Sequence, residues 1–177
     1  LYILLEKRVH KAKSLLAISR KISVDIDSTL IDRAKETNQN TNIDFSVVNI
    51  MTVNDRLLIQ KYLETYNVKN FDVIFCFSVT MWIHLNNGDK GLLDFLNYIK
   101  SISRTIVIEP QPWKCYRNAQ RRVKKSGHCF QHYESLKIKN NVDDEIKNII
   151  SNGSHSITYE SASSSWNRKI QSFQSAE

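Results

Sequence analysis

Glycine is scarce in this chain and is absent from the part where a nucleotide-binding loop would be expected. The sequence has four glycines among 177 residues, and the first of them is Gly88. A glycine-rich loop, which lets the backbone approach a cofactor closely, is therefore excluded ahead of Gly88. Either no nucleotide cofactor binds, or that loop precedes Leu1. Residues 1–9 read as the middle of a helix, which favours the second alternative, so we expect the N-terminal part of the domain to be missing from this sequence.

Cysteines and long apolar runs are also few. The three cysteines, Cys76, Cys115 and Cys129, show no C-x-x-C spacing, which argues against a disulfide framework and against a closed zinc site. We expect a reducing compartment and no metal ion. The longest apolar runs, such as 71–82, fall short of the roughly 20 residues that span a bilayer, so we expect no membrane segment.

Hydrophobic residues make up 41% of the sequence and charged residues 24%, as in folded globular proteins. At this length we expect one domain over residues 1–177. The formal net charge is +7, and residues 110–140 alone carry eight basic side chains against one acidic side chain. A polyanion such as nucleic acid is the natural partner for this segment.

Apolar runs and amphipathic stretches alternate along the chain, which predicts an α/β fold with a parallel sheet. A basic connection is expected at 10–21, and a terminal antiparallel pair at 156–160 and 168–173. The predicted strands are 22–26, 43–48, 71–77 and 105–108, and the predicted helices are 28–34, 55–66, 92–99, 112–125 and 143–150. In such folds ligands bind beyond the carboxyl ends of the strands.

Asp25 and Asp27 follow the first of these strands. A carboxylate at this place in a nucleotide-binding sheet can accept hydrogen bonds from both hydroxyls of a ribose. The alternative is a pair of helix-capping aspartates. The spacing alone leaves the two interpretations equal.

A second group, Trp82, His84, Asn86 and Asp89, lies just past the strand at 71–77. Two rings with an amide and a carboxylate are suited to a substrate site. The alternative for His84 is a core position, which is the more common place for an isolated histidine.

The segment from Glu109 onward combines Gln111, Trp113 and Tyr116 with many cations. At 100° per residue, one face of the predicted helix carries a row of positive charges, and Tyr116 lies on the opposite face. This cationic stripe consists of Lys114, Arg117, Arg121 and Lys125. Charge runs usually mark a solvated face, but a stripe of one sign favours phosphate binding, for which the planar arginine side chain is well suited.

The motifs VDIDSTLIDRA, NFDVIFCF, SVTMWIHLNNGD and VIEPQPWKCYRNAQRR resemble the Bin3-type RNA methyltransferases over almost the whole chain. The WKCYR continuation is most similar to the branch that modifies RNA 5′-monophosphates. The resemblance implies a Rossmann-like, seven-stranded fold and S-adenosylmethionine-dependent methylation of the 5′-monophosphate of a small RNA, such as a transfer RNA or a precursor microRNA. The family's cofactor loop, of the L-D-V-G-C-N type, would directly precede Leu1-Tyr2.

The resemblance also implies roles for particular residues. Asp25 would hold the cofactor ribose, Asn49 and Ile50 would border the adenine, and Phe77 would form a nearby wall. Ile26 would also belong to the cofactor-binding residues. The residues facing the methyl-transfer centre and the RNA end would be Trp82, His84, Asn86, Glu109, Gln111, Trp113, Lys114, Tyr116, Arg117 and Arg121.

Other functions remain open at this point. A non-catalytic RNA-binding module would also account for the cationic stripe, and an oxidoreductase would account for Asp25. A related branch of the family methylates γ-phosphates. We expect a monomeric methyltransferase in the cytoplasm or the nucleus, with S-adenosylmethionine as its cofactor and no membrane partner.

Overall fold

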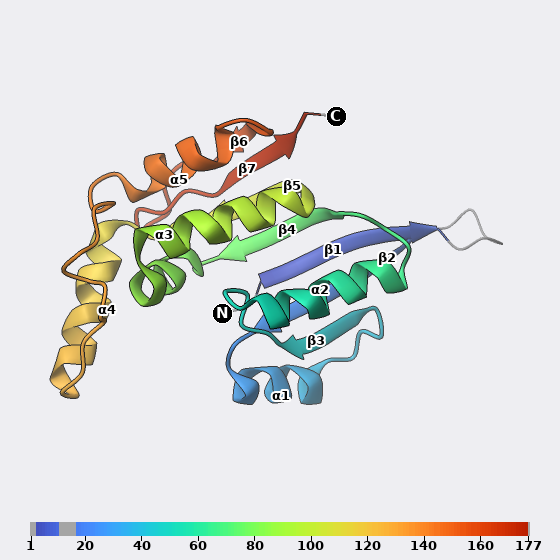
Figure 1. The fold of residues 1–177 in the computed structure, drawn as a ribbon, viewed down its shortest axis with the longest axis horizontal. Coiled ribbons are helices and arrows are strands. Elements are labelled where there is room, and N and C mark those ends of the chain that lie inside the picture. The colour runs from blue at the N-terminus through green and yellow to red at the C-terminus, as the bar shows by residue number, and fades with distance from the viewer. Residues whose placement is uncertain (1–2, 11–16, 177) are drawn as a thin grey trace.

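Strands of the described part of the chain form one seven-stranded sheet in the order β3-β2-β1-β4-β5-β7-β6 (Figure 1). The computed structural model describes residues 3–10 and 17–176. Pairing is parallel between β2 and β3 and between β4 and β5, and antiparallel elsewhere. The strands are β1 Ile3–His10, β2 Ala17–Asp25, β3 Ile43–Val47, β4 Phe71–Phe77, β5 Ser103–Glu109, β6 His155–Glu160 and β7 Gln171–Ser175.

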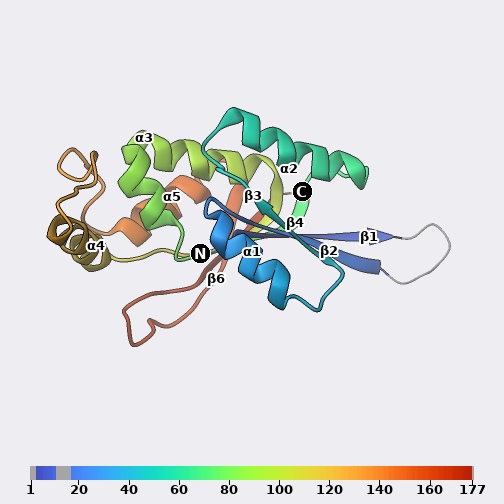
Figure 2. The same cartoon turned by 90° about the horizontal axis from the view of Figure 1, so that it is seen from below.

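Helices cover both faces of this sheet. Figure 2 shows α2 and α3 on one face and α1 on the other, and α5 packs beside α3. The helices are α1 Ser28–Thr37, α2 Val53–Thr65, α3 Thr80–Ser101, α4 Trp113–Lys125 and α5 Val142–Ser151. Within the residues described, no helix has the length and apolar character needed to cross a membrane.

Local signals in the sequence account for where several helices begin and end. The carboxylate of Asp27 accepts hydrogen bonds from the first turn of α1, and the hydroxyl of Thr52 does the same for α2, because the first backbone N–H groups of a helix have no partner within it. Gly88 interrupts α3 with a φ of 70°, a conformation that glycine adopts without strain. The predicted strands at 43–48, 71–77 and 105–108 and all five predicted helices are confirmed, with shifts at their ends.

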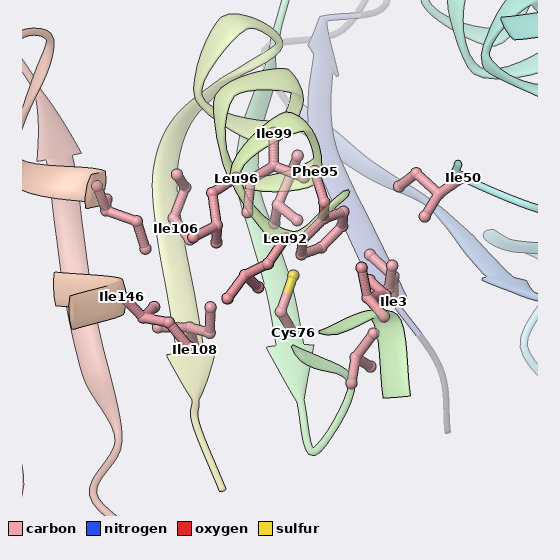
Figure 3. Packing of buried hydrophobic residues seen from close by; sticks show 14 of the residues in the cluster. Ile3, Ile50, Cys76, Leu92, Phe95, Leu96, Ile99, Ile106, Ile108 and Ile146 are labelled. Atoms are coloured by element: carbon pink, nitrogen blue, oxygen red, sulfur yellow. The ribbon is translucent and has the colours of Figure 1, made fainter. Parts of the chain in front are cut away.

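The core lies between the sheet and α3. Figure 3 shows apolar side chains of the second half of α3, including Leu92, Phe95 and Leu96, over Cys76 of β4 and Ile108 of β5. These side chains are almost completely shielded from solvent. Apolar residues on one face of α3, spaced by its 3.6-residue period, thus pack on alternate residues of β4 and β5. This packing fixes the start of α3 near the carboxyl ends of these strands.

The N-terminal segment differs from our expectation. We predicted a helix over residues 1–9 and a connection over 10–21, but the structure has β1 at Ile3–His10, and β2 already begins at Ala17. Ile3 and Leu5 are buried, and β1 forms hydrogen-bonded ladders with both β2 and β4. A central place in a sheet satisfies the backbone on both sides and buries alternate side chains, and this outweighs a weak helical preference. Residues 1, 2 and 11–16 lie outside the described part.

We predicted a parallel sheet, but the sheet in the structure is mixed. β1 runs antiparallel to both of its neighbours. Only residues 11–16 separate β1 from β2 in the sequence, and a parallel pair would need a crossover of a dozen residues or more. The expected terminal pair is confirmed, since β6 and β7 are antiparallel.

Candidate active site

Two cavities lie at the carboxyl ends of the strands, and Trp82 of α3 lines both of them. The first cavity has a volume of about 450 Å³ and adjoins the ends of β2 and β3. The second has a volume of about 400 Å³ and adjoins the ends of β4 and β5, beside α4. Both volumes fall in the range of about 300–1,000 Å³ that is typical of small-molecule sites.

Asp25 and Asp27 have separate roles at the first cavity. Asp27 caps α1, since its Oδ1 accepts hydrogen bonds from the N–H groups of Thr29, at 2.9 Å, and Leu30, at 3.3 Å. Asp25 is buried, lines the cavity, and accepts a hydrogen bond from the Asp27 N–H at 2.8 Å. The capping interpretation therefore holds for Asp27, while Asp25 has the position that ribose binding would require.

The turn after β3 forms a second wall of the first cavity. The N–H of Asn49 donates to the Asp55 carboxylate at 2.7 Å, and the side-chain oxygen of Asn49 accepts from the N–H of Met51 at 3.1 Å. Arg56 holds the carbonyl of Ile50 at 2.7 Å through its Nε. Ile50 is 6% exposed and presents an apolar surface to the cavity, as a flat aromatic base would require.

The first turns of α3 close the first cavity on the side of β4. Trp82, Ile83, Asn86 and Asn87 all line it, because positions separated by four residues share one helix face. The amide nitrogen of Asn86 donates to the carbonyl of Trp82 at 2.8 Å, which fixes its orientation at the cavity wall.

Phe77 lies apart from these residues. It is 41% exposed and does not line either cavity. Along β4 the buried Cys76 faces α3, so the next residue points to the opposite face of the sheet. There the Phe77 ring packs 5.9 Å from that of Phe75.

His84 of α3 and Tyr116 of α4 lie together in the core. Both side chains are fully buried and neither lines a cavity. His84 Nε2 lies 2.9 Å from Asp89 Oδ1, and His84 Nδ1 lies 3.1 Å from the hydroxyl of Tyr116. Asp89 also accepts hydrogen bonds from the backbone N–H groups of Lys137 and Ile138. This network joins α3, α4 and the segment before α5.

The directions of the pKa shifts in this network indicate which of its groups carry protons. Burial lowers the pKa of His84 below its usual value of 6.5, against the opposing effect of Asp89. Burial alone would raise the pKa of Asp89, but hydrogen bonds from Lys137, His84 and Ile138 outweigh it and lower that pKa. Because an ionised Asp89 only accepts, neutral His84 donates from Nε2 and accepts the proton of Tyr116 at Nδ1.

Trp113 and Gln111 also support the scaffold. The Trp113 ring stacks against Tyr116 and Tyr133, with centroid distances of 5.0 and 5.4 Å. Gln111 is 2% exposed. Its amide nitrogen donates to the carbonyl of Ser78 at 2.7 Å, and its amide oxygen accepts from the N–H of Met81 at 3.3 Å. Gln111 therefore caps α3 from the end of β5 and also lines the second cavity.

The second cavity contains a charged cluster that the sequence did not reveal. Arg168 donates to the hydroxyl of Ser78 at 2.9 Å and lies 3.6 Å from the carboxylate of Glu109. The hydroxyl of Ser78 donates to the same carboxylate at 2.6 Å. The Ser78 backbone has a φ of 57°, in the left-handed region that serine rarely adopts. Glu109 thus holds an arginine at the cavity and is not itself part of the lining.

The cationic stripe lies outside both cavities. Lys114, Arg117 and Arg121 are exposed on α4, and the face of α4 that meets the second cavity carries Cys115, Asn118 and Arg122 instead. These two faces adjoin one another at 100° per residue. Among the residues that line the second cavity, those that the sequence analysis did not assign to a site are Ser78, Met81, Cys115, Asn118, Arg122 and Arg168.

No group of three or more His, Cys, Asp or Glu side chains that could hold a metal ion is present in the described ranges. Burial raises the pKa of the Cys76 thiol to about 12, so this cysteine remains a neutral core residue. The expectation of a protein without bound metal stays a prediction.

Comparison with known proteins identifies relatives of this chain. The profile of the family described as Bicoid-interacting protein 3 (Bin3) matches residues 71–175. The RNA 5′-monophosphate methyltransferase of Bos taurus is 40% identical over 148 residues, which cover 80% of this chain and 51% of the relative. The pre-miRNA 5′-monophosphate methyltransferase of Xenopus laevis is 38% identical over 150 residues, which cover 82% and 59%. The chain spans about half the length of the curated relatives it matches.

Solved structures show the same fold at low sequence identity. The N-methyltransferase NodS of Bradyrhizobium japonicum, in complex with S-adenosyl-L-homocysteine, has a TM-score of 0.53 and 13% identity, over 87% of this chain and 65% of that one. A SAM-dependent methyltransferase of Anabaena variabilis has a TM-score of 0.55 and 7% identity, over 88% and 68%. The predicted fold class, the Rossmann-like fold of S-adenosylmethionine-dependent methyltransferases, is confirmed.

Proposed function

The chain belongs to the Bin3 family, and from this membership we propose that it methylates the 5′-monophosphate of a small RNA with S-adenosylmethionine as the methyl donor. Its relatives in Bos taurus and Xenopus laevis are named for activity on RNA and pre-miRNA 5′-monophosphates. The observation that carries the proposal is the pair of cavities that share Trp82, one lined by a buried carboxylate and the other by two arginines.

The first cavity fits the cofactor by its chemistry. Asp25 is a buried acceptor at the end of β2, suited to the two hydroxyls of a ribose. Ile50 and Val48 are apolar walls suited to the adenine, beside the fixed turn at Asn49. We propose these roles for Asp25, Asn49 and Ile50.

The residues of this chain would bind and orient, and they would not need to remove a proton. When bound, S-adenosylmethionine would supply an electrophilic methyl group, whose bond to sulfur breaks with the electron pair left on sulfur as a phosphate oxygen bonds to carbon. A phosphate oxygen is already ionised at neutral pH, so the main contribution of the protein is position. Trp82, at the boundary of the two cavities, is placed to align the phosphate with the methyl group.

The cationic stripe would then hold the RNA beyond its end. Lys114, Arg117 and Arg121 lie on the face of α4 next to the face that meets the second cavity. Contacts of this kind neutralise backbone phosphates without reading sequence. We propose that these residues follow the RNA backbone.

A methylation assay with matched RNAs tests the proposal. The purified protein is incubated with S-adenosylmethionine carrying a labelled methyl group and with one RNA sequence ending in a 5′-hydroxyl, a 5′-monophosphate or a 5′-triphosphate. We expect label in the monophosphate RNA, and a methyl phosphate ester at its first nucleotide by mass spectrometry. Label mainly in the triphosphate RNA would indicate γ-phosphate methylation. RNA binding without affinity for S-adenosylmethionine would indicate a non-catalytic module.

A further inference from the structure

We propose that Arg168 is the principal ligand of the RNA 5′-phosphate, which would bind in the second cavity; this step rests on the proposed function. The cavity is lined by two charged side chains, Arg122 and Arg168. Within the described residues, no aspartate or glutamate belongs to its lining. A cavity of this composition attracts an anion, and arginine is the side chain best suited to hold a phosphate through two hydrogen bonds.

The environment of Arg168 fixes one edge of its guanidinium group and leaves the other edge poorly paired. Nη1 donates to the hydroxyl of Ser78 at 2.9 Å and lies 3.6 Å from Glu109. Among the described residues, Nη2 has only the sulfur of Cys115 as a hydrogen-bond partner, at 3.7 Å, and sulfur is a weak acceptor. Nε is buried and has no hydrogen-bond partner in the part of the chain that the structure describes. The donors Nε and Nη2 lie on the same side of the planar group, so one phosphate could accept from both.

A buried donor without a partner is unfavourable, which makes this edge the natural place for an incoming acceptor. A phosphate oxygen that displaced the thiol of Cys115 would give Nη2 a strong partner and Nε its first. The opposite edge would stay on Ser78 and Glu109. Ser78 lines the cavity and Glu109 does not. We treat both as positioning residues, because they orient Arg168.

The turn that carries Ser78 supports this interpretation independently. Its φ of 57° is uncommon for serine, and such a conformation persists only where the surroundings hold it. Gln111 holds the Ser78 carbonyl at 2.7 Å, and the Ser78 hydroxyl binds Glu109 at 2.6 Å. The strained turn thus places one hydroxyl between an acid and Arg168 at the cavity wall.

The location of the second cavity suits the acceptor of a methyl group. Trp82 forms part of its lining and part of the lining of the first cavity. A phosphate held by Arg168 would therefore lie next to the proposed cofactor site. The stripe residues Lys114 and Arg117 line neither cavity, which separates binding of the RNA end from binding of the RNA backbone.

The test compares the affinity of the protein for two short single-stranded RNAs of one sequence, one with a 5′-phosphate and one with a 5′-hydroxyl, at equal salt. The measured quantity is the ratio of the two affinities. We expect Arg168→Gln to lower this ratio at least tenfold, as the loss of charged hydrogen bonds implies. Arg168→Lys keeps the charge and loses the two-pronged geometry, so its loss should be intermediate. Arg104→Gln, at an exposed position at the far end of β5, is the matched control and should leave the ratio unchanged.

Each outcome distinguishes this inference from the proposed function. If the unmodified protein shows no preference for the 5′-phosphate, the role of Arg168 is overturned, whereas the proposed function is decided separately by the methylation assay. If it shows the preference and a folded Arg168→Gln protein keeps it, the proposed function stands and the role of Arg168 is overturned. Should Arg168→Gln fail to fold, Arg122→Gln at an exposed position of α4 carries the same test, and an unchanged ratio there overturns the assignment of the cavity. Affinity for S-adenosylmethionine, measured by calorimetry, should be unchanged in both variants.

Discussion

The first cavity takes its walls mainly from strand ends and the segments that follow them, whereas the second joins segments that lie far apart in the sequence. Asp25 is the last residue of β2, and Asn49 and Val79 come shortly after β3 and β4; all three line the first cavity. In the second, Arg168 binds Ser78 across 90 positions of sequence. A cavity built from strand ends follows from the fold class alone, but one built from distant segments depends on particular long-range contacts.

The two cavities also differ in the charge of the side chains that line them. The first combines one buried carboxylate with apolar walls such as Ile50, and the second combines two arginines with Gln111. A neutral or cationic ligand suits the first and an anion suits the second. Trp82, which belongs to both, is the point where their contents would meet.

The largest expected effect would disrupt both cavities at once. Gln111→Ala removes the amide that caps α3 and holds Ser78, and it leaves the buried Met81 N–H and Ser78 carbonyl without that partner. We expect a loss of about 3 kcal/mol in the free energy of unfolding, measured by urea denaturation, and weaker binding at both cavities. Gln120→Ala is the matched control, because Gln120 is also buried but holds only the Phe130 N–H, at 3.2 Å. Equal losses in the two variants would contradict the special role of Gln111.

The next effect is confined to the first cavity. Asp25→Ala should weaken binding of S-adenosylmethionine at least tenfold, because each hydrogen bond to a charged group contributes roughly 1.5–3 kcal/mol. Asp27 also lines the first cavity but is exposed. Asp27→Ala removes the cap of α1, and it should lower stability by about 1 kcal/mol with a smaller change in cofactor affinity than Asp25→Ala. Calorimetry on both folded variants checks the pair. Unchanged affinity in Asp25→Ala would rule out its contact with the ribose.

A smaller effect should appear beside the second cavity as a dependence on pH. Burial lowers the pKa of His84 in the folded protein, so below pH 6.5 the unfolded chain binds a proton that the folded chain does not. Stability is therefore complete above the unfolded pKa and falls as the pH drops below it, by at most about 1.4 kcal/mol per pH unit for this histidine. His155 also has a lowered pKa, mainly through burial, and contributes in the same direction.

His84→Gln isolates the contribution of His84. Urea denaturation at pH 7.5, 6.5 and 5.5 should show a smaller loss of stability with acid in this variant than in the unmodified protein. Because His84 and Tyr116 join α3 to α4, the affinity for 5′-phosphate RNA should fall more than the affinity for S-adenosylmethionine. An identical pH dependence in the two proteins would mean that His84 does not titrate as described.

The smallest expected effect distinguishes the cationic stripe from the second cavity. Arg117→Ala and Lys125→Ala should each weaken RNA binding a few-fold and lower the slope of log affinity against log salt by about one unit or less. The ratio of affinities for 5′-phosphate and 5′-hydroxyl RNA should stay constant. Titrations at three salt concentrations measure both quantities. A changed ratio in Arg117→Ala would assign the RNA end to the stripe.

The strands β4 and β5 and the helix α4 could be predicted because their local patterns agree with their surroundings. Residues 71–77 form an apolar run, and Pro112 precedes an amphipathic helix that begins at Trp113. The predicted helix over residues 1–9 was wrong because burial between β2 and β4, which no local pattern reports, decided the conformation of Ile3 and Leu5.

The candidate site shows the same limit. Asp25 and Asn49 could be predicted to lie together because parallel strand ends meet at one edge of a sheet. Arg168 could not, because the sequence only places it at the start of the predicted strand 168–173, and it reaches the second cavity through the pairing of β5 with β7. His84 and Tyr116 carry side chains suited to chemistry, and only their burial reveals a structural role.

The pairing of β5 with β7 also sets an order for the folding of the nascent chain. β7 lies directly beside β5 in the sheet, yet α4, α5 and β6 are all synthesised between them. Until residues 171–175 leave the ribosome, the edge of β5 that pairs with β7 has no partner. Unpaired strand edges promote association with other chains. Arg168 comes three residues before β7. The proposed phosphate pocket is therefore completed late in synthesis, and a nascent chain could close the first cavity well before it could recognise the end of an RNA.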